Sequence, residues 1–575
     1  MPTLPVSAAF SSAPLSPADF VSSNCKKQSE VVRSTADFIP SIWGDQFLEY
    51  NEKDAFVVDE QVVEDLKEKV RKERMIKAYD ESTQHLELLE VIDGVQRLGI
   101  AYHFEEEIEK ALQHIYITYG DSWIENKNLK SISLWFRLLR QQGFNVSSGI
   151  FKNQMDQEGQ FNESLSNDAL GMLALYEAGY MRIEGEKVLD DALEFTKIHL
   201  GKIAKNPSYD PLLRTQIEQA LKQPLRKRLQ RLEALRFMPI YAQEANHNEA
   251  LLKLAKLDYN MVQSMHKLEL SQVCKWWKDL DMRNKLPFVR DRVIEGFFWI
   301  LGIYYEPQHS RTRVFLIKSC MWIIVLDDRF DNYGTYEELE LFTQAVERWS
   351  LSCLDDLPEY MHLIYQELLK RHLEMEEVLE KEGKAYHIHY IKEMAKEYTR
   401  NLLMEAKFVK DKYVPTIEEY MSVSLITAAY PLITVRSYVG QGDHVTEDTF
   451  KWIATHPPVV KASATVLRLM DDIGSHKFEQ ERDHVASCVE CYEKEAGGSE
   501  EEAYEYFSKK VEDAWKVMNR ATLRPTDVPV PVLMPAINLA RVADAIYYGG
   551  RDSYSHAGSD MKYYIKSLFV NPVDV

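Results

Sequence analysis

Helical periodicity constrains this chain more than any other feature. From about residue 57 to the C-terminus, apolar residues recur three and four positions apart, as in "DEQVVEDLKEKVRKERM" and "EEYMSVSLITAAYPLI". Such spacing is typical of amphipathic helices, and alternating strand-like runs are scarce. Breakers such as "KNPSYDP", "THPPVV" and "RPTDVPVPV" separate the helical runs. We predict an all-α protein, and the lack of a fixed-period repeat argues against a helical solenoid.

The length of 575 residues exceeds what one ordinary hydrophobic core serves, so two helical domains are expected. No low-complexity linker marks the boundary, and we place it near "EANHNEALL", within residues 240–255. The resulting division is a Ser- and Ala-rich leader over residues 1–32 without fixed structure, an N-terminal domain over residues 33–245 and a C-terminal domain over residues 246–575.

The excess of acidic residues restricts the kinds of molecule that the protein is expected to bind. Asp and Glu number 90 against 69 Lys and Arg, which gives a net charge of -21. A nucleic-acid backbone or an anionic lipid surface is therefore not expected as a partner. No apolar run reaches the roughly 18 residues that a spanning helix needs, so stable membrane insertion is not expected either. The six cysteines are too few for a disulfide scaffold, and Cys488 and Cys491 lack the partners of a zinc site.

A cluster of three acids, in "VLDDRFDNYG", follows the apolar run "CMWIIV". Asp327 and Asp331 lie about 40° apart on a helix, with Asp328 at their flank. Gly334 can end this helix, and "TYEE" can begin the next with a capping box. A solvated helix end or an acidic loop would explain the cluster. However, acids at the negative end of the helix dipole are unfavourable without a cation, and Mg²⁺ would supply one.

A second oxygen-rich helix face occurs in "RLMDDIGSHKFEQER". Asp471, Ser475 and Glu479 are spaced at i, i+4 and i+8, and Arg468 falls in the same sector. Taken alone, this is usually an exposed charged face. Two oxygen-ligand faces on separate helices together indicate divalent metal binding.

Two further stretches offer complementary chemistry. In "VRDRVIEGFFWILGIYY", Arg290 and Arg292 precede an aromatic-rich helix that contains Trp299. Metals and arginines can stabilise a departing diphosphate, and aromatic faces can stabilise a carbocation. Near the C-terminus, the glycines of "YYGGRDSYSH" permit a loop that could close over a pocket, with the polar side chains Tyr547, Asp552 and Tyr554. Surface arginines, an ordinary aromatic core and a plain polar turn are the alternatives.

In combination these motifs resemble the plant class I terpene synthases, of the angiosperm sesquiterpene synthase type and delta-cadinene synthase-like, over about residues 33–575. "DDRFD" is similar to the DDxxD motif of that family, "DDIGSHKFE" to its second metal motif and "RDR" to its RxR element. "RSTADFIPSIWGDQF", "VQRLGIAYHF", "FRLLRQQGFNVS" and "KWWKDLD" also resemble recurring stretches of the family.

The resemblance implies a C-terminal class I terpenoid synthase α-bundle, a relictual N-terminal α-barrel-like domain, and a carbon–oxygen lyase acting on phosphates. It implies that Mg²⁺, as three ions with Mn²⁺ as a possible substitute, ionises farnesyl diphosphate, whose carbocation cyclises to a sesquiterpene. By motif position the metal ligands would be Asp327, Asp328, Asp331, Asp471, Ser475 and Glu479. Arg290, Arg292 and Arg468 would bind the diphosphate, Trp299 would stabilise cations, and Tyr547, Asp552 and Tyr554 would belong to the closing loop and pocket wall.

The sequence departs from the family pattern at several positions. Arg329 stands inside the first metal motif, where its helical phase predicts a side chain pointing away from the ligand face. Arg436 interrupts an apolar helix where the family more often has a small residue. Ser34 replaces the second arginine of the tandem pair of plastidial monoterpene synthases, which favours cytosolic farnesyl diphosphate as the substrate and a cytoplasmic location over the plastid. A monomer is also expected. A monoterpene synthase using geranyl diphosphate, or a catalytically silent helical interaction protein, is the alternative.

Overall fold

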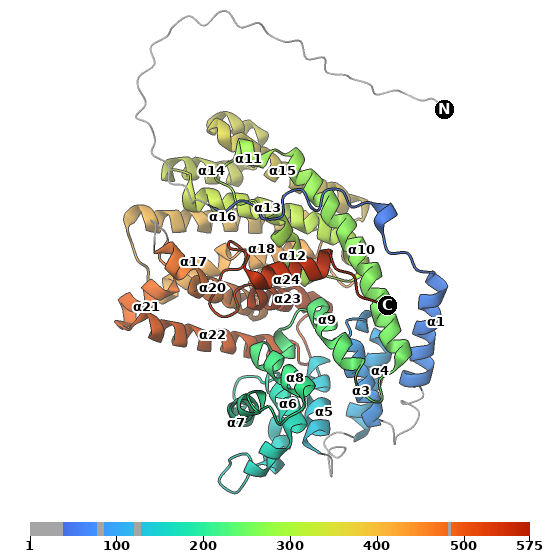
Figure 1. The fold of residues 1–575 in the computed structure, drawn as a ribbon. Helices are drawn as coiled ribbons and strands as arrows, with labels where there is room; N and C mark the ends of the chain where they lie inside the picture. The colour runs from blue at the N-terminus through green and yellow to red at the C-terminus, as the bar shows by residue number, and fades with distance from the viewer. Residues whose placement is uncertain (1–37, 77–84, 120–127, 481–484) are drawn as a thin grey trace, which may run out of the picture.

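The computed structural model describes residues 38–76, 85–119, 128–480 and 485–575, and within these ranges it is built from helices without a named strand (Figure 1). This confirms the all-α prediction. The expectations for the leader, for Arg33 and for Ser34 lie outside the described residues.

The principal helices are α1 (Glu60–Val70), α3 (His85–Arg97), α4 (Glu105–Tyr119), α5 (Leu129–Gln141), α6 (Ala169–Gly179), α7 (Lys187–Ala204), α8 (Pro211–Lys222), α9 (Gln230–Tyr241), α10 (Glu249–Asp279), α11 (Met282–Lys285), α12 (Val293–Ile303), α13 (Ser310–Asn332), α14 (Tyr336–Arg348), α15 (Glu359–Lys381), α16 (His387–Asp411), α17 (Ile417–Thr427), α18 (Tyr430–Ser437), α19 (Glu447–Ile453), α20 (Pro458–Glu479), α21 (Cys488–Ala496), α22 (Glu500–Ala521), α23 (Val530–Ile546) and α24 (Ser559–Phe569).

Two large hydrophobic clusters organise the packing. One joins buried side chains between Val63 and Tyr259, and the other joins side chains between Trp43 and Phe569. Helix α10 contributes to both, and Figure 1 shows it running along the molecule beside both sets of helices. Trp43 and Phe47 precede α1 in the chain yet belong to the C-terminal cluster. The stretch before the first helix is therefore held against the later half of the chain.

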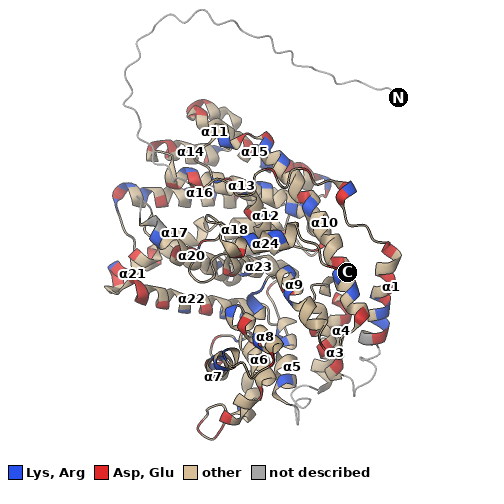
Figure 2. Ribbon diagram, viewed as in Figure 1, with Lys and Arg blue, Asp and Glu red and all other residues tan. Residues whose placement is uncertain are grey.

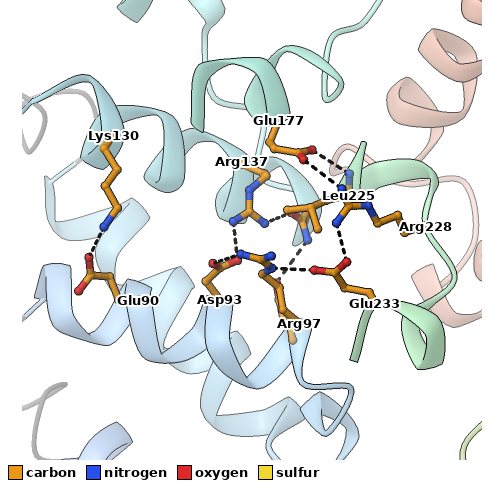
Figure 3. Close-up of polar contacts among 11 residues, drawn as sticks. Glu90, Asp93, Arg97, Lys130, Arg137, Glu177, Leu225, Arg228 and Glu233 are labelled. Carbon is orange, nitrogen blue, oxygen red and sulfur yellow. Dashed lines mark hydrogen bonds and ion pairs between the residues drawn. The ribbon is translucent and has the colours of Figure 1, made fainter. Parts of the chain in front are cut away.

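A buried ion network ties the N-terminal helices together (Figure 3). Asp93 and Arg97 lie one turn apart on α3, where Asp93 pairs with Arg137 of α5 and the Arg97 Nε lies 2.9 Å from Glu233 Oε1 of α9. Glu233 also accepts a 2.6 Å hydrogen bond from Arg228. Because each charge faces an opposite charge, the network satisfies groups that would be costly to bury alone.

Figure 2 shows Lys and Arg interspersed with Asp and Glu along the helices. Within the described ranges, no helix combines the length and apolarity needed to cross a bilayer. Cys488 and Cys491 are free and buried in α21.

Candidate active site

The end of α13 has the predicted local structure. The Gly334 N–H donates a 2.9 Å hydrogen bond to the Arg329 carbonyl, and a Cβ atom at Gly334 would lie only 2.5 Å from the Leu339 side chain. Thr335 and Glu338 then form the capping box that begins α14. The acidic cluster therefore lies at a helix C-terminus, where the helix dipole adds to its negative charge.

Most of the predicted site residues line one cavity of about 220 Å³ in the C-terminal cluster. The predicted residues whose side chains line it are Arg290, Trp299, Asp327, Asp331, Arg468, Asp471, Ser475, Tyr547, Asp552 and Tyr554. They come from the segment before α12, from α12, α13 and α20, from the end of α23 and from the loop before α24, so residues from both ends of the C-terminal half meet in space. Glu479 ends α20, and its side chain lies outside the described residues.

Asp328 takes a different position from the one expected for a metal ligand. It is fully buried and is not among the cavity-lining side chains of the described chain. Its Oδ2 accepts a 2.7 Å hydrogen bond from the Arg290 backbone N–H, and its Oδ1 lies 2.6 Å from Arg290 Nε. Burial raises the pKa of Asp328 to about 6 even though the Arg290 charge lowers it. In this structure Asp328 orients Arg290, whose Nη2 reaches Asp327 at 2.6 Å.

Arg292 also differs from its expected position. It is buried and does not line the described part of the cavity. Its Nη2 donates to two carbonyl oxygens, that of Ile39 at 2.7 Å and that of Ser555 at 2.8 Å, and its Nε donates to the Tyr554 carbonyl at 3.2 Å. These bonds join the segment before α1 to the loop before α24, instead of presenting the guanidinium to the cavity.

A third carboxylate joins the acids of α13. Glu405 of α16 lines the cavity, and burial raises its pKa to about 7 against the lowering effect of Arg468. The Asp331 side chain is exposed to the cavity. Its pKa is nevertheless raised, mainly because the surrounding protein removes water from the carboxylate, and also because of the negative charge of Asp327. No sequence pattern indicated Glu405, because a single glutamate in an amphipathic helix usually lies on the solvated face.

Helix α20 contributes polar and charged side chains to the same cavity. Arg468, Asp471 and Ser475 line the cavity as their spacing predicts. The Arg468 Nη1 lies 3.8 Å from Asp471 Oδ2 and 3.6 Å from Asp472 Oδ1. Asp472 is buried, and its Oδ2 accepts hydrogen bonds from the Tyr420 hydroxyl at 2.6 Å and from the backbone N–H of Cys488 at 2.9 Å. Asp472 therefore fixes α20 against α17 and α21.

Aromatic rings form another part of the cavity wall. The Trp299 ring makes edge contacts with Tyr554 at 5.3 Å, Tyr430 at 6.2 Å and Tyr547 at 6.5 Å between centroids. Asp552 shapes the loop, since its Oδ1 accepts the backbone N–H groups of Tyr554 and Ser555 at 2.8 and 2.9 Å. Such ring faces can stabilise a cation that has no water around it.

A break between α17 and α18 places backbone at the cavity wall. The stretch "EEYMSVSLITAAYPLI" has helical periodicity, but Ala429 has φ of +62° and separates two helices within it. Thr427, Ala428 and Ala429 line the cavity at this break. Pro431 was the available signal, because proline favours the first turn of a helix and thus marks a new start.

Arg329 points away from the cavity, as its helical phase predicts. Its guanidinium carbon lies 3.8 Å from the Phe342 ring centroid, and its Nη2 contacts Met361 Sδ at 3.0 Å. The side chain is fully buried, so Arg329 is not a surface cation. Arg329 is part of the packing between α13, α14 and α15.

The residues at the acidic end fit a divalent metal that also takes ligands from a substrate. No three His, Cys, Asp or Glu side chains of the described chain are grouped closely enough to hold a metal by themselves. Mg²⁺ commonly uses one or two carboxylates and completes its shell with water and phosphate oxygens. The raised pKa of Asp331, caused partly by the Asp327 charge, shows that negative charge is crowded here and that a cation would relieve it.

Two family models match the chain. The description "Terpene synthase, N-terminal domain" matches residues 42–221, and "Terpene synthase family, metal binding domain" matches residues 278–517. The chain belongs to the terpene synthase family. The (E)-beta-farnesene synthase of Artemisia annua is 63% identical over the full length of both chains. The alpha-isocomene synthase of Matricaria chamomilla var. recutita is 49% identical over 95% of this chain and 99% of that one.

A solved structure is also similar. Isoprene synthase from grey poplar leaves, in complex with three Mg²⁺ ions and dimethylallyl-S-thiolodiphosphate, is 34% identical and superposes with a TM-score of 0.83 over 89% of this chain and 97% of that chain. These findings confirm the predicted family, the two-part helical fold and the enzyme class, a lyase acting on prenyl diphosphates.

Proposed function

We propose that this protein is a Mg²⁺-dependent sesquiterpene synthase that ionises farnesyl diphosphate and cyclises the carbocation, with release of diphosphate. The observation that carries the proposal is the meeting of two kinds of side chain in one cavity. Carboxylates and arginines from α13, α16, α20 and the segment before α12 line it together with Trp299 and its neighbouring tyrosines. The charged groups suit a diphosphate with metal ions, and the rings suit an apolar cation.

Metal ligands would come from both helices. Asp327 and Asp331 would hold two Mg²⁺ ions, and Asp471, Ser475 and Glu479 a third, with Mn²⁺ as a possible substitute. When bound, these ions would neutralise the diphosphate so that its bond to carbon breaks more easily. Arg290 and Arg468, both on the cavity wall, would bind the diphosphate oxygens. Asp328 would act by orienting Arg290, through the contacts described above, rather than as a direct ligand.

The remaining residues would protect and guide the cation. Trp299 would stabilise positive charge on the substrate through its ring face. The loop that carries Asp552 and Tyr554 would exclude water, and Arg292 would hold that loop to the segment before α1. Loss of a proton, or capture by water, would end the reaction.

The test uses the purified full chain with farnesyl and geranyl diphosphate in separate assays. Diphosphate release and gas chromatography with mass spectrometry are measured with Mg²⁺, with Mn²⁺ and after chelation. We expect Mg²⁺-dependent sesquiterpene formation and kcat/KM at least about tenfold higher for farnesyl diphosphate, which is about 1.4 kcal/mol in barrier. Higher kcat/KM for geranyl diphosphate would favour a monoterpene synthase. No diphosphate release from either substrate would favour a catalytically silent helical protein.

Three other expectations belong to this proposal. We propose that the protein is a cytoplasmic monomer rather than a plastid enzyme, and that a boundary near residue 245 separates its N-terminal and catalytic domains. Helix α10 begins at Glu249 and supports that boundary. A fluorescent fusion that retains the native N-terminus, and the mass of the purified protein in solution, test localisation and assembly.

A further inference from the structure

Arg436 is buried next to residues of the cavity wall, although its own side chain does not line the described part of the cavity. It follows Ile433, a cavity-lining residue of α18, by three positions and lies about 60° from it around the helix. Its Nη1 donates a 3.4 Å hydrogen bond to the Ser319 carbonyl of α13, next to the cavity-lining Cys320. Ser319 precedes Asp327 by eight residues, which is about 12 Å along the helix.

This arginine carries an isolated positive charge. Its side chain is only 5% exposed, and no carboxylate of the described residues forms an ion pair with it. Burial lowers the pKa of Arg436 to about 10, so it stays protonated at neutral pH. The neighbouring His372 adds no charge, because burial and the Arg436 charge lower its pKa to about 3. The groups that face Arg436 from α13 and α16, Cys320 and Tyr398, are neutral there as well.

The described cavity therefore has acids on its wall and a buried cation beside the wall near Cys320, so a migrating positive charge meets different electrostatic surroundings at different places. With its diphosphate held at the metal site of Asp327 and Asp331, a farnesyl chain lying along α13 would extend toward Cys320. Attack by its terminal double bond on the ionised carbon forms a carbon–carbon bond and moves the positive charge to the far end of the chain. Like charges repel strongly where water is excluded, so that far end is the unfavourable place for the charge.

We propose that Arg436 determines the product class by disfavouring ring closure through the terminal double bond, an inference that rests on the proposed use of farnesyl diphosphate. Ring closure through the nearer, central double bond remains open to the cation, which then loses a proton while its charge lies nearer the acids and Trp299. A C–H bond beside the cationic carbon breaks, its electron pair forms a new double bond, and an oxygen of the released diphosphate accepts the proton. Arg436 therefore influences which cation forms after ionisation, and it does not promote ionisation itself.

The primary experiment compares Arg436→Gln with Arg436→Lys. Both variants keep a hydrogen-bond donor for the Ser319 carbonyl, but only lysine keeps the charge. Products from farnesyl diphosphate are analysed by gas chromatography with mass spectrometry. We expect Arg436→Gln to raise the share of products formed through the terminal double bond at least about threefold, and Arg436→Lys to leave the wild-type profile. An unchanged profile in Arg436→Gln, or an equal change in both variants, overturns the proposal.

A binding measurement on the wild-type protein tests the electrostatic effect of Arg436 directly. It requires neither turnover nor a variant that folds. Two farnesyl-like ammonium compounds are used with inorganic diphosphate and Mg²⁺, one with nitrogen near the ionised end and one with nitrogen at the far end. We expect the far-end ammonium to bind at least about tenfold more weakly, which is 1.4 kcal/mol. Equal binding, or tighter binding of the far-end ammonium, overturns the charge argument. Absence of farnesyl diphosphate turnover would instead overturn the proposed function.

Discussion

Arg292 donates a 2.7 Å hydrogen bond to the carbonyl of Ile39, a residue 253 positions earlier in the chain. The same Nη2 donates to the Ser555 carbonyl, so one guanidinium holds two chain segments that lie beside the cavity. Trp43 adds a second attachment, because its Nε1 donates a 2.9 Å hydrogen bond to the buried Glu295 of α12. The segment before α1 is therefore fixed to the catalytic half by buried polar contacts.

Arg292→Met should loosen both segments. Because neither carbonyl keeps its charged donor, we expect faster hydrogen exchange at residues 38–47 and 552–556 and a loss in kcat/KM of about 10²-fold through misplaced cavity walls. Lys278→Met is the matched control, since it removes only the exposed ion pair with Asp45 and should change stability by less than about 1 kcal/mol. Exchange rates that rise equally in both variants would contradict the clamp.

Asp327 and Asp328 are adjacent in sequence but should behave differently when neutralised. Asp327→Asn should lower kcat by about 10²–10³-fold and raise the Mg²⁺ concentration required for half-maximal activity. Asp328→Asn should instead raise KM, because its carboxylate orients Arg290, while the Mg²⁺ requirement stays within about threefold. Asp356→Asn, which removes a half-exposed pair with Arg348, serves as the control. An equal rise in Mg²⁺ requirement for both variants would make Asp328 a direct ligand after all.

Arg329→Thr separates packing from catalysis at the first metal motif. The structure places this guanidinium over Phe342 and against Met361, away from the cavity. We expect a loss in unfolding free energy of about 2–4 kcal/mol, because a large buried side chain is replaced by a small polar one, with kcat per folded molecule within about tenfold. Arg348→Thr, at an exposed arginine, should leave stability nearly unchanged. Retained stability with a collapse of ionisation would place Arg329 in the active site.

The helical spacing of the motifs predicted most of the site. Asp327 with Asp331, and Arg468 with Asp471 and Ser475, line the cavity because a helix of regular phase presents residues four apart on one side. Gly334 and the Thr335 capping box were also predictable, since caps depend on nearby residues. Local rules therefore located the two acidic faces.

Tertiary contacts decided the rest. Asp328 lies between ligand positions in the sequence, but the backbone and side chain of Arg290 occupy both of its oxygens. Glu405 enters the site only because α16 packs beside α13, and no spacing within "NLLMEAKFVKD" indicates that neighbour. The positive φ of Ala429 could not be read from two alanines, because the break depends on where α17 and α18 pack. Residues whose role depends on a distant partner are thus the ones that sequence patterns miss.

Glu512 should make the contact between the two halves of the chain sensitive to acid. Its Oε1 accepts a 2.6 Å hydrogen bond from Lys227 Nζ, and its Oε2 accepts one of 2.7 Å from Arg182 Nη2. Burial alone would raise its pKa, but the two cations outweigh burial and lower the pKa from 4.5 to about 2. Because the folded pKa is below the unfolded one, the stabilisation is complete above about pH 4.5 and is lost as the pH falls toward 2.

We therefore expect Glu512→Gln to lower Tm by about 2–4 °C at pH 7, equivalent to about 1 kcal/mol after allowance for the partly exposed carboxylate. The difference from wild type should shrink as the pH falls from 5 to 3, because the wild-type carboxylate then takes up a proton and loses its advantage over the amide. Circular dichroism melts at several pH values measure this. Glu505→Gln on the same helix removes only an exposed pair with Lys509 and should shift Tm by less than about 1 °C. A Tm difference for Glu512→Gln that stays constant from pH 7 to pH 3 would show that the lost stability comes from packing and not from the charge of this carboxylate.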